Sequence, residues 1–583
     1  MCTPSRSAFL TGKYPIHLGM QHLVILEPEP WGLPLNETLL PQRLKNNGYK
    51  THAIGKWHLG FHKKEYTPTY RGFDSHFGYW QGFHDYYDHT IHATYSNEQG
   101  YDMRKNMTVD WDAKGKYSTT LFTDEAVRII KEHNADEPMF MYFAHLAPHA
   151  GNDQDPLQAP DEEIAKFAHI VDPERRIYAA MMSMMDRSVG EVVNALREKR
   201  MLHNTIIIFM SDNGGATVGI HANTGSNYPF RGMKNSAFEG AMRCAAAIWS
   251  PLIKKPQRVY TDLMHISDWL PTLYSAAGLN KSELGEIDGI DMWESISQDK
   301  KGPRSEILYN IDDVWKYGAI RRNKWKYLYG SVTKKDYWYG TAGTDSHYHY
   351  DIDAILDSKT GTALAGITTY QQIHQKHNDF RHKALNKTDY SVQLLDESII
   401  LRMRGEATVR CKDREPLQVS PDHQCHPSLA PCLFNLKDDP CELVNVAKDN
   451  PLMMNVFKSA LNDFRKTAIA PINVPRDPKA NPIFHNGTWT NWNDIEDIQK
   501  ERVPLNILSP LAIGLITMAC LVFLIVIAVL IALSLRRNTK YKDSDIFSSL
   551  EDARDKPTTE LTMKTCELSR IPYRETTIVK SRD

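Results

Sequence analysis

The stretch TIIIFMSDNGG at residues 205–215 decides the fold class. Its first six residues are almost all apolar, and three are β-branched isoleucines, which is typical of a strand buried on both faces. Polar turn residues follow at once. Strands of this kind belong to parallel sheets, whose ligands bind beyond the carboxyl ends of the strands. The sequence therefore predicts an α/β fold with polar ligands at Asp212 and Asn213.

Similar patterns recur along the first half of the chain. Apolar runs predict further buried strands at residues 49–54, 138–144 and 245–249. Amphipathic segments between them predict helices at residues 39–47, 123–134 and 176–198. Strands that alternate with helices indicate a mainly parallel sheet flanked by helices.

Four parts of the chain differ in composition. Residues 1–303 are predicted to be the catalytic domain, and residues 304–500, which have shorter and more mixed patterns, a smaller C-terminal α+β domain with a stem. Residues 507–535 carry no charge and exceed the roughly 20 apolar residues that span a bilayer, so they predict one transmembrane helix. Residues 536–583 are polar and predict a disordered cytoplasmic tail.

Charges and sequons favour one membrane topology. Basic residues follow residue 535 immediately, at Arg536, Arg537, Lys540 and Lys542, which places that side in the cytoplasm. The glycosylation sequons all precede the span, at Asn36, Asn106, Asn280, Asn386 and Asn486. The sequence therefore predicts a single-pass membrane protein whose catalytic domain is lumenal, in the endoplasmic reticulum or lysosome, or extracellular.

The overall charge excludes one class of partner. The chain has 69 basic and 71 acidic residues and a formal net charge of −2. Nucleic-acid-binding domains carry a strong positive excess, so no nucleic-acid partner is expected.

The cysteines divide by their surroundings. Cys411, Cys425, Cys432 and Cys441 cluster outside the membrane and predict two disulfides, for which three pairings are open. Cys244 lies in an apolar run and is expected to be a buried free thiol.

A further cysteine begins the segment Cys2-Thr3-Pro4-Ser5-Arg6. Pro4 suits the first turn of a helix, so Cys2 is expected at a helix N-terminus, where free N–H groups favour an anion. Arg6 follows about one turn later on the same side. This pattern indicates an oxyanion site, although a structural or disulfide-bonded cysteine explains Cys2 equally well on the residues alone.

Longer motifs carry a resemblance to the sulfatase family. Residues 2–6 with residues 10–13 resemble its first signature, and residues 48–58 resemble its second. Residues 71–74 and 77–79 are similar to the arylsulfatase B branch, the N-acetylgalactosamine-4-sulfatase type. The resemblance covers most of residues 2–445 and implies an alkaline-phosphatase-like fold.

The resemblance implies a sulfatase that cleaves sulfuric esters of sulfated glycans or aryl sulfates. Cys2 would be oxidised to formylglycine by the formylglycine-generating enzyme, and this residue would contact one Ca²⁺ ion together with Asp212 and Asn213. The implied catalytic residues are Cys2, Arg6, Lys56, His58, His149 and Lys234. His149 is preferred to His145, with His149 as the acid towards the leaving oxygen and His58 as the base.

The sequence departs from the family's pattern at its start. Sulfatases carry an Asp-Asp pair on a strand upstream of the cysteine, and no such pair precedes Cys2 here. We therefore expect an N-terminally truncated sequence that is inactive as printed. Two alternatives stay open: a catalytically inactive sulfatase-like membrane glycoprotein, and a phosphate-ester hydrolase of the same fold, against which Cys2 argues because such enzymes use serine or threonine.

Overall fold

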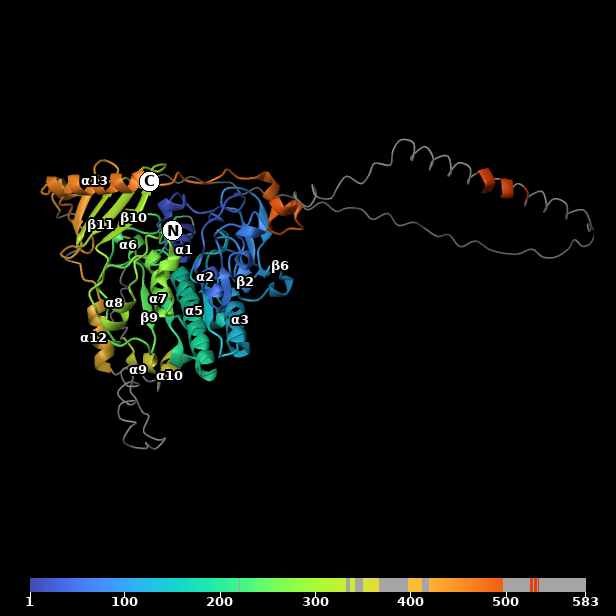
Figure 1. The fold of residues 1–583 in the computed structure, drawn as a ribbon, viewed down its shortest axis with the longest axis horizontal. Coiled ribbons are helices and arrows are strands. Elements are labelled where there is room, and N and C mark those ends of the chain that lie inside the picture. Colours follow the sequence, from blue (N-terminus) through green and yellow to red (C-terminus); the bar gives the residue numbers. More distant parts are fainter. Residues whose placement is uncertain are drawn as a thin grey trace, which may run out of the picture. The chain divides into compact units, whose positions relative to one another are not determined.

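A computed structural model describes residues 1–219, 221–331, 336–340, 350–365, 397–411 and 419–495, with 525–527, 529–531 and 533. Residues 1–501 form one compact unit and residues 502–583 another. All the sheets and the candidate site belong to the first unit, whose elements are labelled in Figure 1.

The central sheet is mixed. Its strand order is β6-β5-β2-β1-β7, with the bounds β1 Lys50–Lys56, β2 Ser75–Tyr79, β5 Arg104–Lys105, β6 Thr108–Val109 and β7 Met139–Ala144. Strand β1 runs parallel to β2 and β7, whereas β5 is antiparallel to β2 and to β6. A two-residue turn with Asn106 at φ 57° joins β5 to β6, and such turns bring consecutive strands together antiparallel. The prediction of a mainly parallel sheet is therefore corrected to a mixed one.

The apolar run in residues 205–215 forms β8 (Ile207–Met210), which pairs with β9 (Ala246–Trp249). Both strands were predicted, and both are confirmed as strands. They run antiparallel, however, from Ile207 opposite Trp249 to Met210 opposite Ala246, in a two-stranded sheet of their own. The apolar runs predicted burial but not direction, because pairing depends on the path of the intervening chain.

Helices cover these strands. The three predicted helices are confirmed as α2 (Leu40–Asn46), α3 (Ser118–Glu132) and α5 (Pro173–Glu198), and α3 and α5 pack side by side (Figure 1). The long α5 begins where the Asp172 carboxylate accepts a hydrogen bond from the backbone N–H of Arg175, with Pro173 in the first turn. The other helices are α1 Cys2–Thr11, α4 Asp161–Ala165, α6 Glu239–Met242, α7 Trp269–Ala276, α8 Trp293–Gln298, α9 Ile352–Leu356, α10 Lys359–Leu364, α12 Glu397–Ala407 and α13 Pro451–Thr467.

A second sheet lies beyond residue 303, as expected, and is antiparallel. Its order is β10-β11-β12-β13, with the bounds Glu306–Asp312, Tyr317–Arg322, Trp325–Tyr329 and Cys432–Asn435. Helix α13 lies across it (Figure 1) and buries Phe457 and Leu461 in one cluster with Leu308, Ile320 and Tyr327. A short hairpin, β3 (Thr90–His92) with β4 (Gln99–Tyr101), completes the strands of the described residues.

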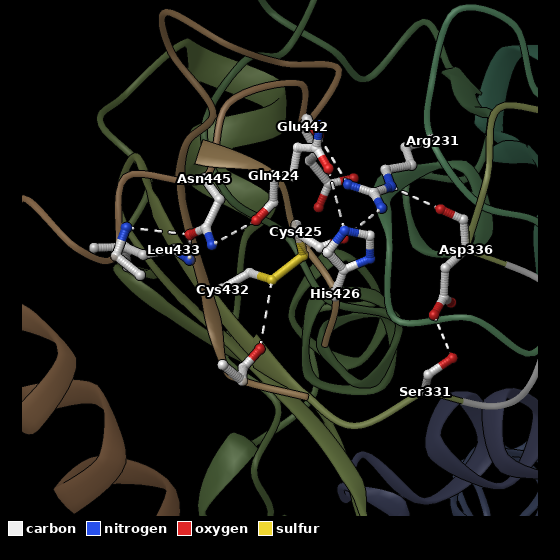
Figure 2. The surroundings of a disulfide bond; sticks show 12 residues. Arg231, Ser331, Asp336, Gln424, Cys425, His426, Cys432, Leu433, Glu442 and Asn445 are labelled. Atoms are coloured by element: carbon white, nitrogen blue, oxygen red, sulfur yellow. Dashed lines mark hydrogen bonds between the residues drawn. A yellow bond between two sulfur atoms is a disulfide. The ribbon is translucent and has the colours of Figure 1, made fainter. Parts of the chain in front are cut away.

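The four clustered cysteines form the two disulfides expected of them. The structure chooses the pairs Cys411–Cys441 and Cys425–Cys432, the second of which is drawn in Figure 2. Cys244 is a free thiol, as predicted, but is only partly buried.

The prediction of a transmembrane helix is corrected. No helix in the described part of the chain is long and apolar enough to cross a membrane. Most of residues 507–535, the whole predicted tail at 536–583 and the sequon at Asn386 lie outside the described residues. The described residues thus give no support to the predicted spanning helix or the single-pass topology, and their fold is a mixed-sheet α/β fold with a second antiparallel sheet.

A cavity of about 1090 Å³ runs along β7 and β8. Neither strand has a second strand partner among the described residues, and α5 contributes Met182, Met185 and Val189 to the lining. At the carboxyl ends of both strands the lining becomes polar and includes Arg6, Lys56 and Asp212. The sheet thus delivers charged side chains to one end of a largely apolar cavity.

Gly55, near the carboxyl end of β1, tests the tight pairing of β1 with β7. Its φ is 85°, and a Cβ there would lie 2.0 Å from the carbonyl oxygen of Ala144. We expect Gly55→Ala to lower the free energy of unfolding by roughly 3 kcal/mol or more, because backbone strain adds to a main-chain clash. Urea denaturation followed by circular dichroism measures the change.

Gly48→Ala is the matched control. Gly48 has the same φ of 85°, but among the described residues nothing lies within 4 Å of its added Cβ. It should cost only the backbone strain, about 1–2 kcal/mol. If the two variants lost the same free energy of unfolding, the close contact of Gly55 with β7 would not add to the cost of the substitution.

Candidate active site

Helix α1 presents Cys2 to the polar end of the cavity. Cys2 is the first residue of the helix and is 3% exposed, which confirms the expected position at a helix N-terminus. The first N–H groups of a helix lack helical acceptors and attract negative charge. The Sγ atom of Cys2 lies 3.8 Å from Oδ1 of Asn213, so the helix start faces the loop after β8.

Arg6 ties this helix to three strands. Its Nε donates to Asp212 Oδ2 at 3.2 Å, after β8. Its Nη1 donates to the backbone oxygen of Lys56 at 3.1 Å, at the end of β1, and to the hydroxyl of Tyr142 at 3.2 Å, on β7. The guanidinium thereby connects these segments. Burial alone would lower its pKa, but Tyr142, Asp212 and Cys2 raise it above the usual value.

Lys56 and His58 follow from the end of β1. Both side chains are buried, and His58 has φ 60°. Its Nε2 lies 2.8 Å from the carbonyl oxygen of Ile25 and therefore carries the proton. Nδ1 of His58 is buried with no hydrogen-bond partner among the described residues. Its free lone pair is the acceptor that a general base needs.

His149 and Lys234 approach from the opposite side. Nζ of Lys234 lies 3.2 Å from Nε2 of His149, whose Nδ1 donates to the backbone oxygen of Ala150 at 2.7 Å. Burial and the charge of Lys234 lower the pKa of His149 to about 4. His145, the rejected alternative, packs its ring 4.0 Å from that of Phe143. Of the two histidines, His149 is the one that contacts Lys234.

Positive charge dominates the thiol's surroundings. Burial alone would raise the pKa of Cys2, but the nearby ammonium groups of Lys234 and Lys56 lower it well below its usual value. Burial lowers the pKa of Lys56 to about 8. For Asp212, burial opposes ionisation, but Arg6, Lys56 and Lys234 outweigh it and lower the pKa. The pocket therefore stabilises an anion at the position of Cys2.

The residues present do not complete a calcium site. Asp212 and Asn213 offer one carboxylate and one amide oxygen beside Cys2, and Asp212 already accepts from Arg6. Ca²⁺ takes 6–8 oxygen ligands. The described residues contain no group of three or more His, Cys, Asp or Glu side chains that could hold a metal ion.

Six of the eight residues singled out from the sequence line this end of the cavity, and the other two, Cys2 and His58, lie beside them. The structure adds Tyr142, which contacts Arg6, and His221, whose ring lies 4.4 Å from Phe83 and 5.7 Å from His149. Tyr142 belongs to an apolar strand and His221 to a loop without a recognisable motif. No sequence signal distinguished either of them from ordinary core and loop residues.

A buried cysteine at a helix start, surrounded by three cations and two histidines, forms a pocket that suits an anionic group. Known proteins agree. The sulfatase family model matches residues 1–279. Mouse arylsulfatase J is 34% identical over 510 residues, which are 86% of this chain and 74% of that protein. The chain belongs to the sulfatase family.

Other similarities are more partial. Human N-acetylgalactosamine-6-sulfatase is 30% identical over 338 residues, which cover 54% of this chain and 60% of that enzyme. The fold resembles that of a sulfatase from Pseudoalteromonas sp., PsFucS1, with a TM-score of 0.52 at 20% identity over 82% of each chain. It also resembles Ps i-CgsB, with a TM-score of 0.57 at 22% identity over 87% of this chain and 88% of the other.

Gly82 tests how closely His58 is held. A Cβ on Gly82 would lie 2.7 Å from Cε1 of His58, so Gly82→Ala should displace the imidazole ring. Because displacements of about 1 Å can cost up to roughly 100-fold in rate, we expect aryl-sulfate hydrolysis to fall by at least 10-fold in an active preparation.

Gly405→Ala, for which no described atom lies within 4 Å of the added Cβ, is the control and should leave turnover unchanged. Full activity of Gly82→Ala, with the protein still folded, would mean that the ring has room to move without consequence.

Proposed function

We propose that this sulfatase removes sulfate from sulfated glycans through a formylglycine formed from Cys2. The observation that carries the proposal is the position of Cys2, which lies at a helix N-terminus among Lys56, Lys234, His58 and His149. An unmodified, structural cysteine would gain nothing from the buried Lys56 and the partly buried Lys234. A residue that carries an oxyanion during turnover would be stabilised by both.

Formylglycine supplies, when hydrated, a hydroxyl that attacks sulfur and a second hydroxyl that allows sulfate to leave. The chain's own residues supply the charge. Lys56, Lys234 and the amides at the start of α1 would bind the sulfuryl oxygens, and Arg6 would hold the segments that present them. Their burial excludes water and strengthens each interaction.

The two histidines carry their proton on different ring nitrogens, Nε2 in His58 and Nδ1 in His149, which supports different roles. His58 keeps Nδ1 free and fits the base towards the nucleophile. His149 holds its Nδ1 proton on Ala150 and shares the proton of Lys234 at Nε2. The Lys234–His149 pair would therefore pass a proton to the leaving oxygen as negative charge develops there.

The substrate class follows from chemistry and relatives together. One relative bears the name arylsulfatase J and another the name N-acetylgalactosamine-6-sulfatase, whereas residues 71–79 resemble the 4-sulfatase type. We favour a sulfated N-acetylgalactosamine unit as substrate. Parallel assays with the 4-sulfate, the 6-sulfate and an aryl sulfate distinguish these substrates.

We propose that Ca²⁺ binds at this site only if further residues supply ligands. Asp212 and Asn213 would supply two of the 6–8 oxygens that the ion requires. This shortage also favours a second candidate, a sulfatase-like binding protein without turnover. Calorimetric titration with Ca²⁺ separates the two: tight binding supports the enzyme, and no binding together with no turnover supports the binding protein.

The nucleophile is tested by mass spectrometry of the Cys2 peptide from protein made in cells that contain the formylglycine-generating enzyme. We expect an aldehyde or its hydrate in place of the thiol, and loss of aryl-sulfate hydrolysis in Cys2→Ala. Cys244→Ala, which removes the other free thiol of the described residues, should remain active. Normal turnover by Cys2→Ala would refute the mechanism.

The lysines are tested by Lys56→Ala and Lys234→Ala. Each should lose a charge-assisted contact worth roughly 2–4 kcal/mol in the transition state, a decrease of about 30- to 1000-fold in kcat/KM. The melting temperature should change little, since both side chains line a cavity rather than fill a core. A variant that retains wild-type kcat/KM would show that its lysine does not contact the sulfuryl group.

A further inference from the structure

The loop that carries Lys234 is anchored at both ends by a segment distant in sequence. Arg231 and Glu239 bracket the loop, and the backbone N–H of Gly240 donates to the oxygen of Arg231 at 2.6 Å, which closes it. The backbone N–H of Lys234 donates to the oxygen of Gly215 at 3.1 Å, so the loop also touches the segment after β8. The position of the ammonium group therefore depends on what holds these two ends.

Glu442 contacts both ends. Its carboxylate Oε2 accepts from the backbone N–H of Glu239 at 2.7 Å, and its backbone oxygen accepts from Nη1 of Arg231 at 3.3 Å. Arg231 also donates to the backbone oxygens of Cys425 and Asp336. Figure 2 shows its guanidinium between Asp336 and Glu442, beside the Cys425–Cys432 disulfide.

A buried lysine of the second sheet completes this cluster. Nζ of Lys326, on β12, lies 2.9 Å from Glu239 Oε1 and 2.8 Å from Glu442 Oε1. All three side chains are at most 2% exposed. The hydroxyl of Tyr309 donates to Glu239 at 2.8 Å, and Arg321 lies 3.8 Å from it. Two carboxylates thus share one fully buried ammonium, which links the second sheet to the Lys234 loop.

We propose that Lys326, Glu239 and Glu442 form a latch that positions Lys234 against the sulfuryl group. The inference rests on the proposed role of Lys234. Buried ion clusters are weak sources of net stability, because desolvation offsets most of their attraction. They do fix geometry, since each charge has few arrangements in which it is satisfied. None of the three lines the cavity of the candidate site, so they are positioning residues.

Protonation of Glu442 makes the latch depend on pH. Burial and the neighbouring Glu239 raise the pKa of Glu442, although Lys326 opposes the shift. The charged groups that face the pair are Lys326, Arg321 and Arg231. A carboxyl group whose pKa is higher in the folded than in the unfolded protein stabilises the folded state fully below the unfolded pKa. That stabilisation is lost as the pH rises through the folded pKa. The latch should therefore hold best in acid and loosen on the alkaline side.

The test is a double-mutant cycle between the latch and Lys234, in protein that carries the modified Cys2. The triple variant Lys326→Met/Glu239→Gln/Glu442→Gln removes the three fully buried charges together. Arg321, which loses Glu239, is 20% exposed and can still be solvated. We expect kcat/KM to fall about 10- to 100-fold, hydrogen exchange over residues 231–240 to accelerate, and the triple change to add nothing in a Lys234→Ala background.

The control is Arg322→Met, which removes the Arg322–Glu306 pair of the same sheet and should alter none of these measurements. Equal losses from the latch variant with and without Lys234 would overturn the proposal, as would unchanged exchange over residues 231–240. If Lys234→Ala alone keeps full activity, the proposed role of Lys234 fails instead. If the triple variant does not fold, the single variant Glu442→Gln tests the latch instead. It should extend activity to higher pH, and an unchanged pH profile would refute the latch.

Discussion

The buried guanidinium of Arg6 joins the segments on which the site depends. It bonds to Asp212 after β8, to the backbone of Lys56 at the end of β1 and to Tyr142 on β7. Two further contacts hold the start of helix α1 at the sheet ends: the Thr3 hydroxyl donates to the backbone oxygen of His58 at 3.0 Å, and Cys2 Sγ lies 3.8 Å from Asn213 Oδ1. Because arginine remains charged even when buried, this connection does not vary with pH. The nucleophile's position is thus fixed by a group whose own charge is constant.

Lys234 is joined to the sheet ends by its backbone N–H, which donates to the oxygen of Gly215 after β8, and not by a side chain that bonds to several strands as Arg6 does. It reaches the pocket from a loop, and its position relative to Cys2 is set by backbone contacts and by the cluster of Lys326, Glu239 and Glu442. The two halves of the site are therefore held by different means. Arg6 fixes the half built on the central sheet, and the second sheet holds the other half through charges that can gain or lose a proton.

The sequence predicted the parts that local patterns encode. Residues 173–198 are a helix because the capping carboxylate of Asp172 and apolar periodicity agree there. Lys56, Asp212 and Asn213 lie where strands end, as their patterns predicted. Strand direction was not predictable, since β5 and β6 have two residues each and β8 pairs with a strand about 40 residues away. Lys326 alternates with Trp325 and Tyr327 and is indistinguishable from a solvent-facing lysine until β13 and Glu442 are folded over it.

Charge also explains why two ligands after β8 cannot complete a metal site. Arg6, Lys56 and Lys234 bring three positive charges to a region where Asp212 and an ionised Cys2 supply two negative ones. A divalent cation beside Asp212 would add two more positive charges and compete with Arg6 for the same carboxylate. Such an ion would be stable only if further carboxylates approached it from the open side of the cavity along β7 and β8. A metal ion at this site would therefore need further ligands that are negatively charged, and not only more oxygen atoms, because of the three cations around it.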